Sequence, residues 1–236
     1  MKFSLLALLF SSAALAQPEV ILAPVDHLYV PQGFDSNDAV EVVVTGTFPN
    51  VCYSRNTVDV KVNGDIIDIE VTALAPDASK NSLNGKLCPA MVVPFKEVIT
   101  LGNFQGGEYE IRVNKSIQKD LNDKITIAEA TSNAVDDNVY AAIDYVEQNS
   151  SKDFILKGWK YSNCFELKEV KVVSNKKDTL SILPIMKQVS NHCPMKGMPV
   201  AYPVKIDFNT IKVKQPLLHV RTLDGKSVNS IVNLEE

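Results

Sequence analysis

The chain has 236 residues, of which 45% are hydrophobic and 22% are charged. This balance is typical of a globular protein and excludes a disordered, collagenous or low-complexity chain. The formal net charge of −4 excludes a general basic surface for nucleic acid, and the 3 His and 1 Trp leave few residues from which a catalytic site can be assembled.

Residues 1–16 predict a secretory signal peptide. The segment has one lysine near its start, a short apolar run and an Ala-Leu-Ala ending that is typical of a cleavage site. The run is shorter than the roughly 20 apolar residues that a membrane span needs, and no later stretch approaches that length. We therefore expect no membrane span and export to the periplasm or out of the cell, where disulfides persist. Sequons at Asn114 and Asn149 would be used only in a eukaryotic secretory pathway.

Both halves of the mature chain carry the alternating apolar pattern of short β-strands. In the first half the pattern covers 40–44, 58–62, 65–71 and 109–113, and in the second it covers 153–157, 170–173, 180–183, 204–206, 211–213 and 217–220. The dipeptide Asn63-Gly64 predicts a tight hairpin between two of these strands. About seven short strands per 100 residues is the count of an immunoglobulin-like sandwich.

Residues 136–148 allow two interpretations. Val139, Ile143 and Val146 have helical spacing, and Asp136 precedes them as a possible N-cap. The matching segment of the first half, 21–30, contains Pro24 and is followed by Pro31. Because proline disfavours helical backbone in the residue before it, this segment is expected to be extended. We predict a strand in both places.

The two halves repeat the same landmarks in the same order. Gly46 and Cys52 match Gly158 and Cys164, with six positions from glycine to cysteine in each half. The other matches are 25–28 with 143–146, 88–94 with 193–199, 110–112 with 219–221, and 121–124 with 223–226. This internal repeat predicts an all-β fold of two tandem immunoglobulin-like β-sandwich domains, residues 17–128 and 136–236, joined by a linker at 129–135. The Cys-Trp-Cys arrangement of antibody domains is missing, so the likeness is one of architecture.

The four cysteines are predicted to form one disulfide in each domain. Four cysteines allow three pairings, and only Cys52 with Cys88 and Cys164 with Cys193 gives both copies of the repeat the same bridge. A redox or metal-binding role needs a C-x-x-C motif or a Cys/His cluster, and the sequence has neither. We therefore expect structural disulfides, each worth roughly 3.5–4 kcal/mol in the chain-entropy model.

Two groups of residues have ligand types that suit a metal ion. Soft ligands for Cu(I) are offered by Met186, His192, Met195 and Met198. Met195 and Met198 match Ala90 and Val93 in the repeat, which favours methionine as core filler. Oxygen ligands for Ca²⁺ between the domains are offered by 35–38 and 136–138. Ordinary turn chemistry explains these Asp and Asn residues better, so no metal site is expected.

A catalytic triad would have to use His27, His192 or His219. His27 and His219 occupy alternating strand positions, and no G-x-S-x-G nucleophile elbow is present. No glycine-rich loop that could hold a phosphate occurs either. We therefore expect no enzyme, no catalytic residue and no cofactor.

Charge is shared unequally between the halves, with a net −6 over residues 17–128 and +2 over 134–236. The sequence favours an exported, non-catalytic protein that binds a protein or a glycan through loops, a sheet edge or the groove between its domains. One alternative is a periplasmic chaperone, a family that the chain resembles in its length and its paired immunoglobulin-like domains. Others are a secreted protease inhibitor that presents the loop 75–86, and a periplasmic copper carrier.

Overall fold

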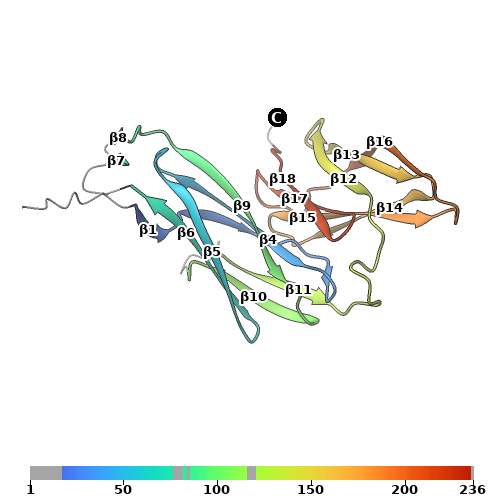
Figure 1. Ribbon diagram of the computed structural model, residues 1–236, viewed down its shortest axis with the longest axis horizontal. Helices are drawn as coiled ribbons and strands as arrows, with labels where there is room; N and C mark the ends of the chain where they lie inside the picture. The colour runs from blue at the N-terminus through green and yellow to red at the C-terminus, as the bar shows by residue number, and fades with distance from the viewer. Residues whose placement is uncertain (1–17, 77–81, 84–85, 116–120, 235–236) are drawn as a thin grey trace, which may run out of the picture.

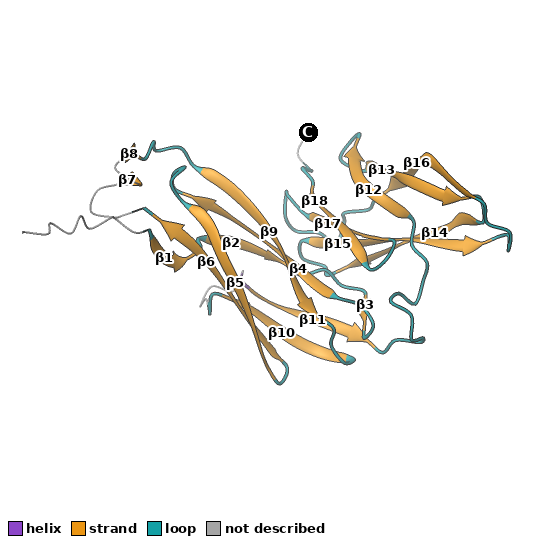
Figure 2. Cartoon of the chain, in the orientation of Figure 1, coloured by secondary structure: helices purple, strands orange, loops and turns teal. Residues whose placement is uncertain are grey.

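A computed structural model describes residues 18–76, 82–83, 86–115 and 121–234. The predicted signal peptide, residues 1–16, lies outside these described residues. Every regular element in the described part is a β-strand (Figure 2), so the chain is all-β as predicted.

The first sandwich consists of two facing sheets. One sheet has the order β2 (Val25–Tyr29), β4 (Val40–Phe48) and β9 (Val93–Gly102). The other is built on β5 (Ser54–Asn63), β6 (Ile66–Ala75), β10 (Gly107–Val113) and β11 (Asn122–Ala128), with the short strands β1 (Glu19–Leu22) and β3 (Phe34–Asp35) added to it. A small hairpin of β7 (Ser82–Leu83) and β8 (Lys86–Leu87) lies apart from both sheets.

The second sandwich has the same plan, and it lies beside the first along the long axis of the molecule (Figure 1). Its three-stranded sheet has the order β12 (Ala142–Gln148), β13 (Asp153–Ser162) and β16 (Met195–Lys205). Its four-stranded sheet has the order β14 (Phe165–Ser174), β15 (Thr179–Gln188), β17 (Leu217–Thr222) and β18 (Lys226–Ile231). Both copies share one parallel pair, β6 with β10 and β15 with β17, and the first copy has a second one, β3 with β11. These pairs depart from the antiparallel sheets of antibody domains.

The strand register confirms the internal repeat around its glycine landmark but not at its last two matches. Arg112 lies opposite Asn122, whereas Arg221 lies opposite Ser227 and not opposite Asp224, the residue matched with Asn122. In each copy the first strand bulges where it passes a glycine of the second strand, Gly46 in one and Gly158 in the other. A Cβ on Gly46 would lie 2.2 Å from the backbone oxygen of Pro24, and a Cβ on Gly158 would lie 1.9 Å from that of Ala142. The glycine that anchors the sequence match is therefore required by the same close backbone approach in both copies.

Both predicted disulfides are confirmed. Cys52 bonds Cys88 with a Cα–Cα distance of 5.7 Å, and Cys164 bonds Cys193 with 5.4 Å. In each sandwich the bridge joins the turn after the second strand of the repeat to the chain just before the edge strand β9 or β16. The two copies are therefore braced at equivalent places.

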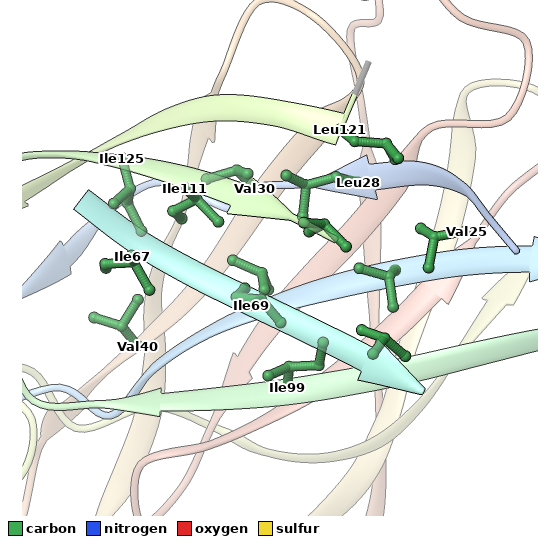
Figure 3. Packing of buried hydrophobic residues seen from close by; sticks show 14 of the residues in the cluster. Val25, Leu28, Val30, Val40, Ile67, Ile69, Ile99, Ile111, Leu121 and Ile125 are labelled. Carbon is green, nitrogen blue, oxygen red and sulfur yellow. The ribbon is translucent and has the colours of Figure 1, made fainter. Parts of the chain in front are cut away.

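Each sandwich has its own apolar core between its sheets. Figure 3 shows the first core, where side chains from both sheets meet, among them Leu28, Val40, Ile67 and Ile111. The second core is centred on residues such as Phe154. Full burial of one such side chain stabilises the fold by about 1.5–3 kcal/mol, so alternation of apolar residues in the sequence largely determines which strand faces point inward.

The alternation also misleads at one predicted strand. Residues 211–213 are not a strand but part of the loop that precedes β17. The Ile211 amide donates to the carbonyl of Phe208, and the Ile211 side chain packs against the second core from this loop. The prediction of a strand at 21–30 is confirmed by β1 and β2. The strand predicted at 136–148 is confirmed by β12 over 142–148 only, since residues 129–139 carry no strand.

Candidate functional site

A small apolar cluster joins the two sandwiches. Tyr29 and Val43 of the first sandwich pack against Leu217 and Ile231 of the second. The Tyr29 hydroxyl donates to the carbonyl of Gln215 at 3.0 Å. Burial, and then the nearby carboxylate of Asp178, raises the pKa of Tyr29 to about 12. The phenol therefore stays neutral and keeps its role as a donor across the junction.

A buried guanidinium lies beside this cluster and joins three segments of the chain. Arg221 of β17 donates to both carboxylate oxygens of Asp38, with one N–O distance of 2.8 Å, and also to Asp136. Its guanidinium carbon lies 5.3 Å from the ring centroids of both Phe34 and Tyr140. All three charged groups are nearly excluded from solvent.

The protonation state of this group is set by its internal pairing. Burial would lower the pKa of Arg221, but the hydrogen bonds and charge of Asp38 outweigh it and raise that pKa above its usual value. Burial raises the pKa of Asp136 more than the charge of Arg221 lowers it. The guanidinium is consequently charged throughout the accessible pH range.

The acidic segments 35–38 and 136–138 do meet between the sandwiches, as their candidacy for calcium requires. The cation between them is the guanidinium of Arg221. Asp137 faces away from it and accepts from the backbone and hydroxyl groups of Thr131 and Ser132. No group of three or more His, Cys, Asp or Glu suited to a metal ion is found in the described part.

His27 forms a second polar link across the junction. Its Nε2 lies 2.9 Å from the fully buried carboxylate of Asp178. The same carboxylate accepts from Asn175 and Thr179 at 2.8 Å each. Burial would raise the pKa of Asp178, but the hydrogen bonds from His27, Asn175 and Thr179 outweigh it and lower that pKa.

His219 is fully buried at the same junction. Its Nδ1 lies 2.9 Å from Oδ1 of Asn229 and 3.7 Å from Glu41, whereas its Nε2 has no hydrogen-bond partner within the described residues. Burial lowers the pKa of this imidazole, against the opposing charge of Glu41. His192 is exposed, and no imidazole in the described part hydrogen-bonds a serine hydroxyl, so none of the three candidates is placed in a triad there.

The buried imidazole should make stability depend on pH between about 7 and 5. The folded pKa of His219 is below the value of about 6.5 in the unfolded chain. Below that pH the unfolded chain binds a proton that the folded chain does not, so the free energy of unfolding falls with decreasing pH, by at most about 1.4 kcal/mol per unit. The loss from Asp178, whose folded pKa is lowered, belongs below about pH 4.

Urea unfolding at pH 7, 6 and 5 measures this slope in the wild type, His219→Asn and the exposed control His192→Asn. We expect the slope to shrink in His219→Asn and to persist in the control. Equal slopes in the wild type and His219→Asn would contradict the assignment.

A groove of about 950 Å³ runs along the outside of this junction, and both sandwiches form its walls. Phe95 and Ile231, both partly exposed, supply apolar surface in it, and the buried Tyr29 lies at its base. Its charged lining, among the described residues, consists of Asp26, Lys96, Lys212 and Lys214. The ammonium of Lys96 reaches across to the carbonyl of Asn229 at 2.8 Å. The lining is therefore mainly cationic although the whole chain is acidic.

The methionines proposed as copper ligands have unlike environments. Met186 on β15 packs against the second core, as expected for core filler. Met195 on β16 is 88% exposed, so the expectation of core packing is wrong for that residue. Its position at the start of an edge strand, rather than in the middle of one, leaves its side chain in solvent. The loop 75–86, suggested for a protease inhibitor, lies largely outside the described residues.

Comparison with known proteins supports the sandwich architecture. Residues 42–122 match the family model of the ORF11 beta-sandwich domain, which covers the first sandwich from β4 to the start of β11. No curated protein and no solved structure matches the chain. No helix in the described part is long and apolar enough to cross a membrane.

Proposed function

We propose that this protein is an exported, non-catalytic binding protein whose interdomain groove binds an acidic, extended segment of a partner protein. The observation that carries the proposal is the groove itself, which both sandwiches line and where lysines outnumber the single aspartate. Export is supported by the leader pattern of residues 1–16 and by the two disulfides.

The charge of the groove favours an acidic partner. Lys212 and Lys214 lie on the exposed loop before β17, and Lys96 lies on the opposite wall. A concave surface of one sign concentrates field lines and accelerates the encounter with a ligand of the opposite sign. Phe95 and Ile231, which are partly exposed, add apolar surface that apolar side chains in an extended segment can cover.

The groove is also preformed. The apolar cluster around Tyr29 and the bond between His27 and Asp178 join the two sandwiches at the groove, and the ion pairs of Arg221 join them at a further point. A binding surface whose walls are already fixed loses less conformational entropy when a partner binds. A fixed arrangement of the two sandwiches would therefore favour tight binding of a partner in the groove.

The test is quantitative affinity capture from the secreted or envelope fraction with a charge-reversal variant. Lys212→Glu/Lys214→Glu removes two cations from the groove wall, and Lys168→Glu/Lys171→Glu makes the same change on the exposed face of β14. We expect the first variant to lose a captured partner by about tenfold or more, with binding that weakens as salt rises. The β14 variant should retain it. A partner captured equally by both variants would contradict the proposal.

A further inference from the structure

The second sandwich contains an apolar pocket of about 190 Å³ that is separate from the interdomain groove. Its walls come from β13, β14, β15, β16, the segment 139–142 and Leu223. Tyr140, Phe165, Met186 and Tyr202 contribute much of the lining. None of the residues that line it lines the interdomain groove.

The repeat shows how this pocket arises. Lys160 lines the pocket and lies opposite Met198, and its counterpart in the first sandwich is Phe48, which lies opposite Val93. Phe48 is only 3% exposed, and its ring centroid lies 4.5 Å from that of Phe95.

The neighbours of Phe48 have also diverged in the second copy. Phe95 corresponds to Val200, since Phe95 lies opposite Gly46 and Val200 opposite Gly158. Two phenylalanine rings that fill the first sandwich are therefore replaced in the second by a lysine and a valine.

Exposed aromatic side chains surround the opening. Trp159, the single tryptophan of the chain, is 44% exposed and Tyr161 is 49% exposed. Their counterparts two positions apart in the first sandwich are Thr47 and Pro49, which are not aromatic. Exposed aromatic rings beside an apolar hollow are typical of a recognition surface, because they bury large areas when a ligand binds.

Lys160 supplies the single charged group in this lining. It forms no ion pair with any residue in the described part of the chain, whereas Lys157 on the same strand pairs with Glu147 at 3.3 Å. An ammonium without a carboxylate partner, placed at an otherwise apolar pocket, favours a ligand that brings its own negative charge.

The volume limits the size of the ligand. A dry apolar cavity of about 150 Å³ holds one benzene molecule, and drug-sized ligands need about 300 Å³ or more. Sugars need several fixed polar partners, and this lining offers only Ser162 and a few tyrosine hydroxyls in addition to Lys160. We propose that the pocket binds a small monocyclic aromatic carboxylate, with its ring among Trp159, Phe165 and Tyr202 and its carboxylate on Lys160.

In the experiment, the full chain is titrated with 3-phenylpropionate and with its neutral amide. Binding is measured by calorimetry and by the change in the fluorescence of Trp159. We expect a Kd on the order of 1 mM for the acid and binding about fivefold weaker for the amide. Lys160→Met should lose the preference for the acid. Lys160→Phe should abolish binding, because it places in the pocket the ring that Phe48 supplies in the first sandwich. Lys157→Met, a change on the same strand, should bind as the wild type does.

Circular dichroism and urea unfolding show whether each variant is folded, and Lys160→Met keeps the test valid if Lys160→Phe is not. Equal binding of acid and amide by the wild type, or unchanged binding by Lys160→Phe, would overturn the proposal. A short peptide with phenylalanine next to aspartate is the third ligand. If the peptide binds and the free acid does not, the pocket takes a partner's side chain and the proposal is wrong.

Discussion

Replacing Arg221 by methionine should lower the free energy of unfolding by about 3–5 kcal/mol. The substitution leaves Asp38 and Asp136 buried without their cation, since Arg221 donates to both carboxylates. Uncompensated buried charge is far more costly than the loss of an exposed pair. Arg112, which pairs with Glu110 at the surface at 2.8 Å, is the matched control, and Arg112→Met should cost less than about 1 kcal/mol.

A triple variant shows whether the destabilisation in Arg221→Met comes from the unpaired carboxylates or from lost packing. Arg221→Met combined with Asp38→Asn and Asp136→Asn removes the stranded negative charges, so it should recover part of the loss. Urea unfolding at pH 7 measures all four proteins. If Arg221→Met were no more destabilising than Arg112→Met, the guanidinium would not be holding the junction together.

The Arg221 group also links the fold to the proposed groove. Asp38 belongs to the first sandwich, Arg221 to the second, and Asp136 to the segment that connects them. Because these bonds hold the sandwiches together, we expect them to help set the spacing of the groove walls, which other residues line. In Arg221→Met the lysines of the groove would still be present, but the two walls would no longer be held at a fixed spacing. We therefore expect the affinity for an acidic partner to fall together with the free energy of unfolding.

The repeat explains how much of the fold the sequence could predict. The disulfide pairing and the two-domain plan were predicted from short stretches, such as Gly46 to Cys52, that recur in the same order in both halves. Once two copies of one plan are recognised, each copy corrects ambiguity in the other, as it did for the strand at 142–148. Local pattern without this comparison was weaker: it predicted no strand at β9, where Pro94 argues against one.

The sequence patterns do not predict the contacts between the two sandwiches. The bonds from His27 to Asp178 and from Arg221 to Asp38 join residues 151 and 183 positions apart, and a repeat only aligns the copies with each other. The sequence suggested that the acidic segments 35–38 and 136–138 could meet between the domains. It did not indicate that a guanidinium lies between them, because Arg221 comes from a strand with no unusual residue pattern. Divergence between the copies, as at Phe48 and Lys160, was the one sequence feature that could have located the aromatic pocket.

Removing either disulfide should cost about 3.5–4 kcal/mol by the chain-entropy model, because the closed loops span 36 and 29 residues. The variants are Cys52→Ala/Cys88→Ala and Cys164→Ala/Cys193→Ala, which leave no unpaired thiol. Since loop length enters as a logarithm, the two costs should differ by only about 0.2 kcal/mol. Domains of this size have a margin of about 5–15 kcal/mol, so the variant lacking both bridges should be close to unfolding at 37 °C.

Urea unfolding of the four proteins without reductant measures these costs, and peptide mapping of the wild type under non-reducing conditions checks the pairing. Nearly equal decreases in the free energy of unfolding would show that both disulfides act mainly by restricting the unfolded chain. A much larger loss for Cys164→Ala/Cys193→Ala would instead show that this bridge stabilises the folded state. That outcome has a structural reason to occur in the second copy alone: Cys164 lies between Ser162 and Phe165, which line the aromatic pocket. The bridge would then support the walls of a pocket whose counterpart in the first sandwich is filled by the packed rings of Phe48 and Phe95.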